Sequence, residues 1–556
     1  MGWMRDETGL DRRAANHAAL TPLSHLARAA QVWPEREALA YGTLRRSYAE
    51  YHERVTQLAS ALAARGVRPG DVVATLLPNV PAQVEASFAV PACGAVLNTV
   101  NVRLDVDTVA YILGHGGARL LLVDSQFLAL AEAACAALED PPEIVECPDE
   151  GAGLPASGRH PTYEDVLASG DPSFAWVMPA DEWESLALNY TSGTTGRPKG
   201  VVYSHRGAYL MTMGTVISWR MVLHPRLLSV VPLFHCNGWC HAWTMPLLGG
   251  TVVCLRDVSA EAILEAIDGQ GVTHFGGAPI VLNMIVQSPP RGPLPRPVEV
   301  FTAGAPPPAA TLARMEALGF VVTHVYGLTE TYGHVVENVW QPDRWDALPP
   351  ARRAALKARQ GVAFPMMEGL EVLGPDGRPV PADGVAQGEI AMRGNAVMKG
   401  YYRAPEATEA ALADGWFRSG DLGVRHPDGY VEIRDRAKDI IISGGENVSS
   451  VEVEGAIMHH PAVSLVAVVA QPDARWGEVP CAFVELRDGA AATEAEILTH
   501  ARSRLAGFKC PRRIVFGPLP KTSTGKIQKF ELRARLKGEA AAAPQAAGEQ
   551  RVGGTA

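Results

Sequence analysis

Ten residues near the middle of the chain combine groups that bind phosphate. Residues 191–200 (TSGTTGRPKG) hold three glycines, four hydroxyl side chains and two cations. Glycines let backbone amides turn inward, and such a nest of N–H groups attracts phosphate, to which hydroxyls and Lys199 add donors and charge. We therefore expect a loop that holds a nucleoside triphosphate; a polar hairpin between two strands is the alternative. The common P-loop pattern is absent, because Lys199 is followed by Gly200 rather than by Ser or Thr.

Four further polar stretches follow in order: YGLTE at 326–330, GWFRSGD at 415–421, DRAKD at 435–439 and PKTSTGK at 520–526. The first follows an apolar run, and a glycine turn at a strand end is a common ligand site in α/β sheets. Its acid, Glu330, would suit Mg²⁺ together with phosphate oxygens. Each stretch alone also has a structural interpretation, as a helix start, a turn or a solvated loop.

One cluster offers four potential metal ligands within seven residues: His235, Cys236, Cys240 and His241. A structural zinc site usually draws on a second, distant ligand pair, and the sequence contains no CxxC. Buried free cysteines beside a substrate pocket are the favoured interpretation.

Composition narrows the class of protein. The chain has 556 residues, 47% hydrophobic and 20% charged, which is ordinary for a globular enzyme of more than one domain. A net charge of -10 argues against a general nucleic-acid binder. No apolar run is long enough to span a bilayer, and the first residues lack the apolar core of a signal peptide. Eight scattered cysteines favour a reducing cytoplasm.

The hydrophobic pattern predicts an α/β fold. Helix-like and strand-like segments alternate over residues 17–125, which implies parallel sheet with covering helices. Residues 137–184 are rich in Pro, Gly and acids and predict a long surface connection. Strands are then expected at 230–234, 251–255 and 298–302.

The pattern changes after about residue 365. Short strands broken by Pro-Asp-Gly and Ala-Asp-Gly turns predict antiparallel sheet, and a second α/β unit follows Lys438. We expect an N-terminal domain over 1–437, a C-terminal domain over 438–537 and a disordered tail over 538–556.

The five motifs, in this order, resemble the adenylate-forming superfamily of acyl-CoA synthetases, adenylation domains and luciferases, from about residue 20 to 537. Within it the chain is most similar to short- and medium-chain acyl-CoA ligases, such as methylthiopropionate–CoA ligases and plant acyl-activating enzymes. The resemblance implies a large domain of mixed and parallel sheets covered by helices, a small antiparallel barrel-like subdomain, and a small mobile α/β C-terminal domain. It also implies the reaction: a carboxylate and ATP give an acyl-adenylate and pyrophosphate, and the acyl group then passes to a thiol.

The resemblance assigns ATP contacts to Thr191, Ser192, Gly193, Thr194, Thr195, Gly196, Lys199, Ala303, Gly304, Ala305, Tyr326, Gly327, Thr329, Asp421 and Arg436. Tyr326 would pack on adenine, and Asp421 and Arg436 would contact the ribose. Glu330 and Thr191 would hold Mg²⁺.

Lys526, His235 and Glu330 are the expected catalytic residues. Attack of a carboxylate on the α-phosphate builds negative charge, so the ammonium of Lys526 would help most in the transition state. Lys438 would be the hinge about which the C-terminal domain rotates between the two half-reactions.

The resemblance implies an acyl pocket lined by His235, Asn237, Gly238, Trp239, Gly327 and Thr331. His235 and Trp239 would narrow it, favouring a short linear or small aromatic acid. Contacts to coenzyme A would come from Gly444, Gly445, Glu446, Arg475 and Lys509.

Two alternatives stay open. The chain could load a carrier-protein thiol instead of coenzyme A, or it could be a nucleotide-binding regulator that no longer catalyses. Family members are often homodimers, so a homodimer is also expected.

Overall fold

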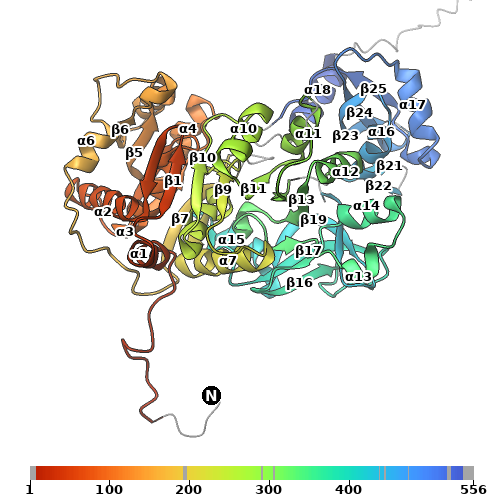
Figure 1. Cartoon of the computed structure of the whole chain (residues 1–556). Helices are drawn as coiled ribbons and strands as arrows, with labels where there is room; N and C mark the ends of the chain where they lie inside the picture. The colour runs from red at the N-terminus through yellow and green to blue at the C-terminus, as the bar shows by residue number, and fades with distance from the viewer. Residues whose placement is uncertain are drawn as a thin grey trace, which may run out of the picture.

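The computed structural model describes residues 8–191, 197–289, 292–304, 307–436, 439–443, 446–473, 475–521 and 527–542. It contains four sheets of nine, seven, four and five strands. In Figure 1 the first elements (red) lie at one side and the C-terminal elements (blue) at the other, above an antiparallel sheet (cyan). The predicted α/β class, with a large mixed N-terminal region, an antiparallel subdomain and a small C-terminal α/β unit, is confirmed.

The nine-stranded sheet has the order β15-β14-β13-β12-β11-β9-β10-β1-β2. Its inner pairs, from β13 to β1, are parallel, and its edges are antiparallel. Its strands are β1 (Glu37–Tyr41), β2 (Leu44–Ser47), β9 (Arg226–Ser229), β10 (Thr251–Cys254), β11 (His274–Gly277), β12 (Val298–Thr302), β13 (Phe320–Tyr326), β14 (Val336–Glu337) and β15 (Val362–Ala363).

The seven-stranded sheet has the order β18-β8-β7-β4-β3-β5-β6. It is parallel from β7 to β6, and β8 and β18 add antiparallel strands at one edge. Its strands are β3 (Val72–Leu76), β4 (Val96–Thr99), β5 (Ala118–Asp124), β6 (Glu143–Cys147), β7 (Ser185–Tyr190), β8 (Gly200–Ser204) and β18 (Gly400–Tyr401).

Helices cover both sheets, and the largest core cluster joins residues of both. Every residue of α3 from Gln83 onward is buried, because this helix packs on strands of both sheets. The helices are α1 (Leu23–Val32), α2 (Tyr48–Ala64), α3 (Pro81–Ala92), α4 (Val106–Gly116), α5 (Leu128–Ala136), α6 (Tyr163–Ala168), α7 (His205–Ser218), α8 (Cys236–Trp239), α9 (His241–Thr244), α10 (Ala260–Gln270), α11 (Pro279–Gln287) and α12 (Ala309–Ala317). Short 3₁₀ turns are η1 (Ser125–Phe127), η2 (Glu150–Ala152), η3 (Met245–Leu248), η4 (Thr329–Thr331), η5 (Ala413–Gly415) and η6 (Gly507–Lys509).

The antiparallel subdomain has the strand order β16-β17-β19-β20. The C-terminal unit holds the five-stranded sheet, of order β22-β21-β24-β23 with β25 paired to β24, and three helices pack on it. Between β14 and β15 lie α13 (Pro342–Trp345) and α14 (Pro350–Ala358), and α14 packs on α12 and β13. The elements of the subdomain are β16 (Met367–Leu373), β17 (Gln387–Gly394), α15 (Pro405–Ala411), β19 (Phe417–Arg425) and β20 (Val431–Arg436). Those of the C-terminal unit are β21 (Ile441–Ser443), β22 (Glu446–Val448), α16 (Ser450–Met458), β23 (Val463–Asp473), β24 (Gly477–Leu486), α17 (Glu494–Arg502), β25 (Arg513–Phe516) and α18 (Lys529–Ala542).

The strand predicted at 230–234 is wrong: β9 ends at Ser229, and the next five residues form a loop. The cause is the side chain of Asn79, which donates to the carbonyls of Ser229 (2.6 Å) and Val231 (3.1 Å). Its carbonyl oxygen accepts from the amide of Leu233 at 2.8 Å. An amide side chain thus takes the hydrogen bonds that a neighbouring strand would supply.

The surface connection predicted over 137–184 is also partly wrong, because it contains α6 and the buried strand β6. Glu146 in β6 is buried, and its carboxylate accepts hydrogen bonds from Ser125 and Ser157 (2.7 Å each). Polar residues in this strand therefore have partners, which composition alone could not reveal. At the other end, α18 runs to Ala542, past the predicted start of the tail at 538; residues 543–556 lie outside the described part.

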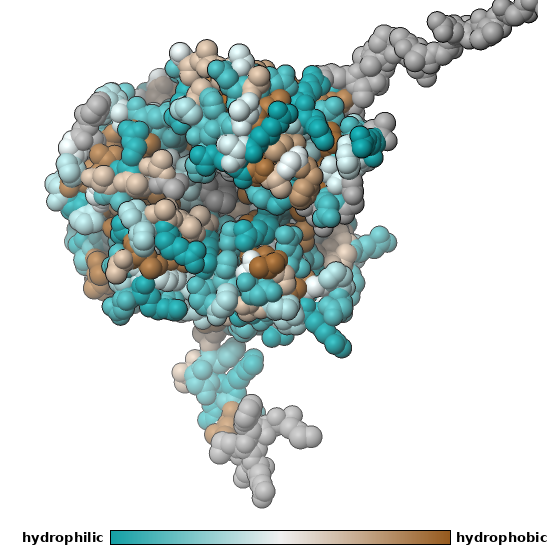
Figure 2. All heavy atoms as spheres, turned by 90° about the vertical axis from the view of Figure 1, so that its right-hand side faces the viewer, coloured by the Kyte–Doolittle hydropathy of each residue, from teal (hydrophilic) through white to brown (hydrophobic). Residues whose placement is uncertain are grey.

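Within the described residues, no helix is both long and apolar enough to cross a membrane. The face that carries the C-terminal unit has hydrophilic and hydrophobic residues interspersed (Figure 2).

Candidate functional site

The predicted phosphate loop joins β7 to β8 at the edge of the seven-stranded sheet. Its ends are closed by a hydrogen bond from the amide of Thr191 to the carbonyl of Lys199 (3.0 Å). At Gly200 an added Cβ would lie 2.9 Å from Leu188 and 3.2 Å from Tyr190, so the hairpin closes tightly only with glycine here. The ammonium of Lys199 lies 4.6 Å from the ring centroid of Tyr401 in β18.

Tyr401 connects this hairpin to Glu330. Its hydroxyl donates to the carboxylate of Glu330 at 2.7 Å, and burial together with Glu330 raises the pKa of Tyr401, so the phenol stays a donor. The amide of Met398 donates to the carbonyl of Glu330 at 2.8 Å. A cation of the phosphate loop and the predicted Mg²⁺ ligand therefore flank one aromatic ring.

Two tyrosines, Tyr203 and Tyr332, hold the turn that carries Glu330. The hydroxyl of Tyr203 donates to the carbonyl of Thr329 at 2.6 Å, and its ring stacks on Tyr332 with centroids 3.9 Å apart. Tyr332 has φ of 60°, and its hydroxyl accepts from the amide of Ser204 at 2.8 Å. A Cβ at Gly207 would lie 2.1 Å from that hydroxyl, so only glycine leaves room for it. Packing thus holds a left-handed residue next to the predicted Mg²⁺ ligand.

The predicted ribose contacts form a connected set. Asp421 in β19 and Arg436 in β20 are paired residues of the same antiparallel ladder. The buried carboxylate of Asp421 accepts from the hydroxyl of Tyr326 at 2.7 Å and lies 3.2 Å from Nε of Arg436. Burial, and then Asp421, raises the pKa of Tyr326 well above its usual value, so this phenol is a donor too. Ala303 and Gly304 directly follow β12, and Gly304 has φ of +96°, a conformation that favours glycine.

His235 precedes a rare left-handed turn at the acyl end of the predicted site. From Cys236 to Cys240 all five residues have positive φ, between 41° and 61°. Such a run is costly for residues with side chains. The backbone amide of Asn237 in the turn donates to the side-chain oxygen of Asn189 (3.3 Å), which also accepts from the hydroxyl of Thr99 (3.3 Å). The side-chain amide of Asn189 donates back to the side-chain oxygen Oδ1 of Asn237. These buried side chains stabilise the turn.

The turn places Trp239 in a closed, apolar setting. A Cβ at Gly276 or Gly333 would lie 2.8 Å or 2.6 Å from the indole, so both glycines let the ring approach the backbone. Behind it lie the rings of His334 and His241, with centroids 5.0 and 5.8 Å away. Burial lowers the pKa of His241 to about 3 and that of His334 well below its usual value, so both stay neutral.

The other acyl-pocket predictions lie on the same two turns. A Cβ at Gly327 would lie 2.6 Å from the carbonyl oxygen of Gly333, and the hydroxyl of Thr331 accepts from the amide of Leu328 at 2.9 Å. Gly238 donates its amide to the carbonyl of His235 at 2.8 Å. Burial raises the pKa of Cys236 to about 12, so its thiol is not an available nucleophile.

The predicted coenzyme A contacts lie on the C-terminal unit. The ammonium of Lys509 is held by both oxygens of Glu452 at 2.8 Å, and the Arg475 guanidinium lies 4.9 Å from the ring centroid of Trp476. Glu446 begins β22. A phosphate on Lys509 would have to displace Glu452, an exposed pair of small energy.

Ten predicted site residues lie outside the described part of the chain: Ser192, Gly193, Thr194, Thr195, Gly196, Ala305, Lys438, Gly444, Gly445 and Lys526.

The sequence interpretation missed Tyr401, Tyr203 and Asn189. Asn189 is the last residue but one of β7, next to the phosphate loop, and a polar side chain in this largely apolar strand could have pointed to it. Tyr401 meets Glu330 only through the pairing of β18 with β8, which no local pattern announces.

Comparison with known proteins decides the family. A family model described as "AMP-binding enzyme" matches residues 26–402, and one described as "AMP-binding enzyme C-terminal domain" matches residues 452–526. The chain belongs to the AMP-binding enzyme family. This assignment confirms the resemblance drawn from the five motifs.

Relatives and solved structures of this family match over nearly the whole chain. An acetate–CoA ligase of Humulus lupulus is 49% identical over 555 residues, covering 96% of this chain and 97% of that protein. A peroxisomal acetate/butyrate–CoA ligase of Arabidopsis thaliana is 48% identical, with 96% and 97% covered. The structure of an O-succinylbenzoate–CoA synthetase of Bacillus subtilis with ATP and magnesium has a TM-score of 0.78 at 27% identity, covering 92% of this chain and 99% of that one.

Proposed function

We propose that this AMP-binding enzyme is an ATP-dependent carboxylate–CoA ligase that activates a short linear acid. The observation that carries the proposal is the pair of connected clusters, Tyr326–Asp421–Arg436 and Lys199–Tyr401–Glu330. The first suits the nucleoside end of ATP and the second suits its phosphates. Relatives named as CoA ligases support the same reaction.

The residues present fit a magnesium ion bound with the phosphates. Glu330 offers one carboxylate, oriented by Tyr401, and the described residues hold no cluster of three or more His, Cys, Asp or Glu that would form an all-protein site. One carboxylate plus phosphate oxygens is the usual way in which Mg²⁺ binds with a nucleotide. When bound, the ion neutralises charge on the phosphate oxygens.

The reaction then needs two displacements. A substrate carboxylate oxygen attacks the α-phosphorus, the bond to pyrophosphate breaks, and Lys526 stabilises the charge that builds on the phosphoryl oxygens. Coenzyme A sulfur next attacks the acyl carbonyl carbon, and AMP leaves with the bonding electrons. Lys199 and the loop glycines would hold the pyrophosphate end, and His235 would orient the carboxylate.

The substrate class rests on Trp239. Because its ring is seated against Gly276 and Gly333 with two buried imidazoles behind, the acyl pocket should end early. Acetate and butyrate are the acids named for the two plant relatives. We infer an acid of about two to four carbons, at the short end of the range that the sequence allowed.

The thiol acceptor is coenzyme A rather than a carrier protein in this proposal, since the relatives are named as CoA ligases. Thioester assays with free coenzyme A and with a phosphopantetheinylated carrier protein separate the two. Release of no pyrophosphate with any acid would favour the regulator alternative.

Two half-reaction variants test the mechanism and the division into domains at 437/438. Lys526→Ala should slow adenylation roughly 100-fold or more, yet still convert supplied acyl-adenylate to thioester. Lys438→Pro should do the reverse, because it removes the hinge about which residues 438–537 would rotate. Equal loss of both half-reactions in a folded Lys526→Ala protein would contradict the assigned role.

Two further expectations stand as proposals. All eight cysteines are buried and free, which supports a reducing compartment; the cytoplasm is the simplest, although one relative is named as peroxisomal. Cell fractionation separates the two compartments, and analytical ultracentrifugation tests the homodimer.

A further inference from the structure

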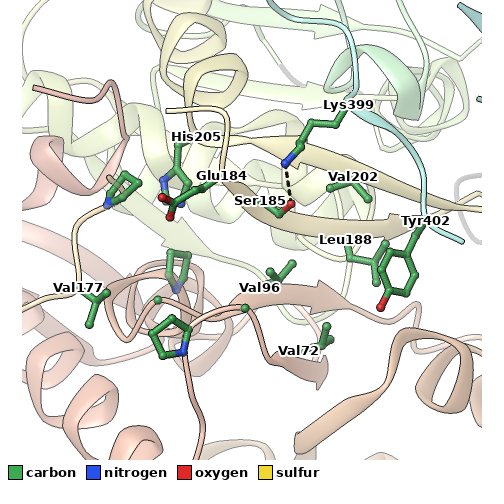
Figure 3. A pocket seen from close by; sticks show the side chains of 15 residues that line it. Val72, Val96, Val177, Glu184, Ser185, Leu188, Val202, His205, Lys399 and Tyr402 are labelled. Atoms are coloured by element: carbon green, nitrogen blue, oxygen red, sulfur yellow. Dashed lines mark hydrogen bonds between the residues drawn. The ribbon is translucent and has the colours of Figure 1, made fainter. Parts of the chain in front are cut away.

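A cavity lies away from the predicted nucleotide site. It has a volume of about 490 Å³ and lies at the amino ends of parallel strands, since Val72 begins β3, Val96 begins β4 and Ser185 begins β7 (Figure 3). The phosphate loop follows the opposite, carboxyl end of β7. The cavity and the phosphate loop therefore lie at opposite ends of β7.

Most of the cavity wall is aliphatic. Val72, Val96 and Leu188 form a small buried cluster on neighbouring strands, against which Val202 and Tyr402 pack. Figure 3 shows these side chains around the space from both sides. The volume falls within the range of about 300–1,000 Å³ that is usual for small-molecule sites.

One ammonium group lies at the polar end. The side chain of Lys399, half-buried, reaches across to donate to the hydroxyl of Ser185 at 3.0 Å (Figure 3). Its Nζ also lies 5.6 Å from the ring centroid of Trp183. Within the described part of the chain it makes no ion pair with a carboxylate.

One carboxylate, that of Glu184, also lines the cavity, and it and the neighbouring Asp181 accept hydrogen bonds from backbone amides. Glu184 accepts from the amides of Ala180 (3.0 Å) and Asp181 (3.1 Å), and Asp181 accepts from that of Trp183 (2.9 Å). Burial lowers the pKa of Lys399, against the raising influence of Asp181 and Glu184. A cation thus lies beside an apolar space with its charge only partly compensated.

Besides Lys399, Glu184 and Tyr402, the titratable group in the wall is His205. Its Nδ1 shares a hydrogen bond with the hydroxyl of Thr21 at 2.8 Å, and burial lowers its pKa to about 4. It is neutral near pH 7, so Lys399 is the cation among the described residues that line the cavity.

We propose that this cavity binds an aliphatic monocarboxylate of medium chain length, with its carboxylate on Lys399 and Ser185 and its chain among Val72, Val96 and Leu188. A charge-assisted hydrogen bond to the ammonium fixes the carboxylate, and each methylene buried among the aliphatic side chains favours binding. The site is distinct from the acyl pocket, which Trp239 closes, and the proposal does not depend on which acid is activated.

Decanoate is the probe, titrated by calorimetry into the full-length enzyme saturated with the butyl ester of AMP, so that the nucleotide site and the acyl pocket are filled. One decanoate should bind per chain. Lys399→Met should weaken binding at least tenfold, whereas Lys399→Arg, which keeps the charge, should stay within about threefold. Lys357→Met, which removes a lysine paired with Glu316 far from the cavity, is the matched control and should leave binding unchanged.

Two further experiments test the proposal even if the Lys399→Met protein does not fold. Val202→Phe fills the cavity without changing charge and should abolish decanoate binding. Decanol, which has the same chain but no charge, should bind at least tenfold more weakly than decanoate. Equal binding by wild type and Lys399→Met, equal binding of decanol and decanoate, or no binding once the butyl ester is present would each overturn the proposal.

Discussion

At the scale of single residues, substitution of Tyr401 tests whether its hydroxyl orients Glu330 at the phosphate end of the site. Tyr401→Phe removes the 2.7 Å hydrogen bond to Glu330 but keeps the ring beneath Lys199. A hydrogen bond to a charged group contributes about 1.5–3 kcal/mol, so kcat/KM for MgATP should fall roughly 10- to 100-fold, with a higher Mg²⁺ requirement. Tyr402→Phe is the control. An equal effect of both variants would show that Glu330 needs no orientation by Tyr401.

In the proposed function, Trp239 limits the chain length of the acid that the enzyme accepts. Trp239→Ala should open space behind the acyl pocket and raise the ratio of kcat/KM for octanoate to that for acetate at least tenfold, since each accommodated methylene is worth about 1–3 kcal/mol. Both acids are measured on the same preparation, so a partial loss of folded enzyme cancels in the ratio. An unchanged ratio would place the end of the pocket elsewhere.

At the scale of elements, the sequence pattern predicted features that depend on residues close together in the chain. The glycine-rich loop and the acids at strand ends came from spacing, and β12 was placed residue for residue. The strand at 230–234 failed because Asn79, about 150 residues earlier, binds that backbone. Tyr401 was missed for the same reason, as its partner is set by pairing between β18 and β8. Sequence spacing finds groups on one element; contacts between distant elements need the fold.

The packing of α2, α3, α6 and β2 depends on one buried carboxylate. Glu85 in α3 is fully buried and accepts from Arg54 (2.8 Å) and Tyr163 (2.6 Å), and it also pairs with Arg46. Glu85→Gln removes the negative charge that Arg46 and Arg54 bind in this buried cluster. The free energy of unfolding, measured by urea denaturation, should therefore fall by about 3–5 kcal/mol.

The control for this prediction is Glu143→Gln, which removes an exposed pair with Arg65 and should cost less than about 1 kcal/mol. Similar losses in both variants would show that burial of the Glu85 cluster adds nothing to stability.

At the scale of the whole molecule, buried neutral histidines should make the fold sensitive to acid. Burial lowers the pKa of His25, His205, His274 and His324 to about 4 each, and that of His241 to about 3. Below the unfolded value of about 6.5 the unfolded chain binds protons that the folded chain excludes. Their stabilising effect is therefore complete above pH 6.5 and is lost as pH falls toward 4.

Three carboxyl groups, those of Glu299, Glu337 and Glu454, act in the opposite direction, because burial raises their pKa values. Burial raises the pKa of Glu337 to about 7, against the lowering effect of its hydrogen bond from Ser218, so protonation of this group favours the folded state as pH falls from 7 toward 4.5. These three carboxyl groups oppose six buried imidazoles, since the pKa of His334 is lowered as well, so net stability should decrease. We expect the melting temperature to fall steeply between pH 6.5 and 4.5. His324→Gln should reduce the pH dependence of the free energy of unfolding by up to about 1.4 kcal/mol per pH unit, and Glu337→Gln should increase it. A melting temperature independent of pH in this window would mean that these imidazoles are protonated in the folded enzyme.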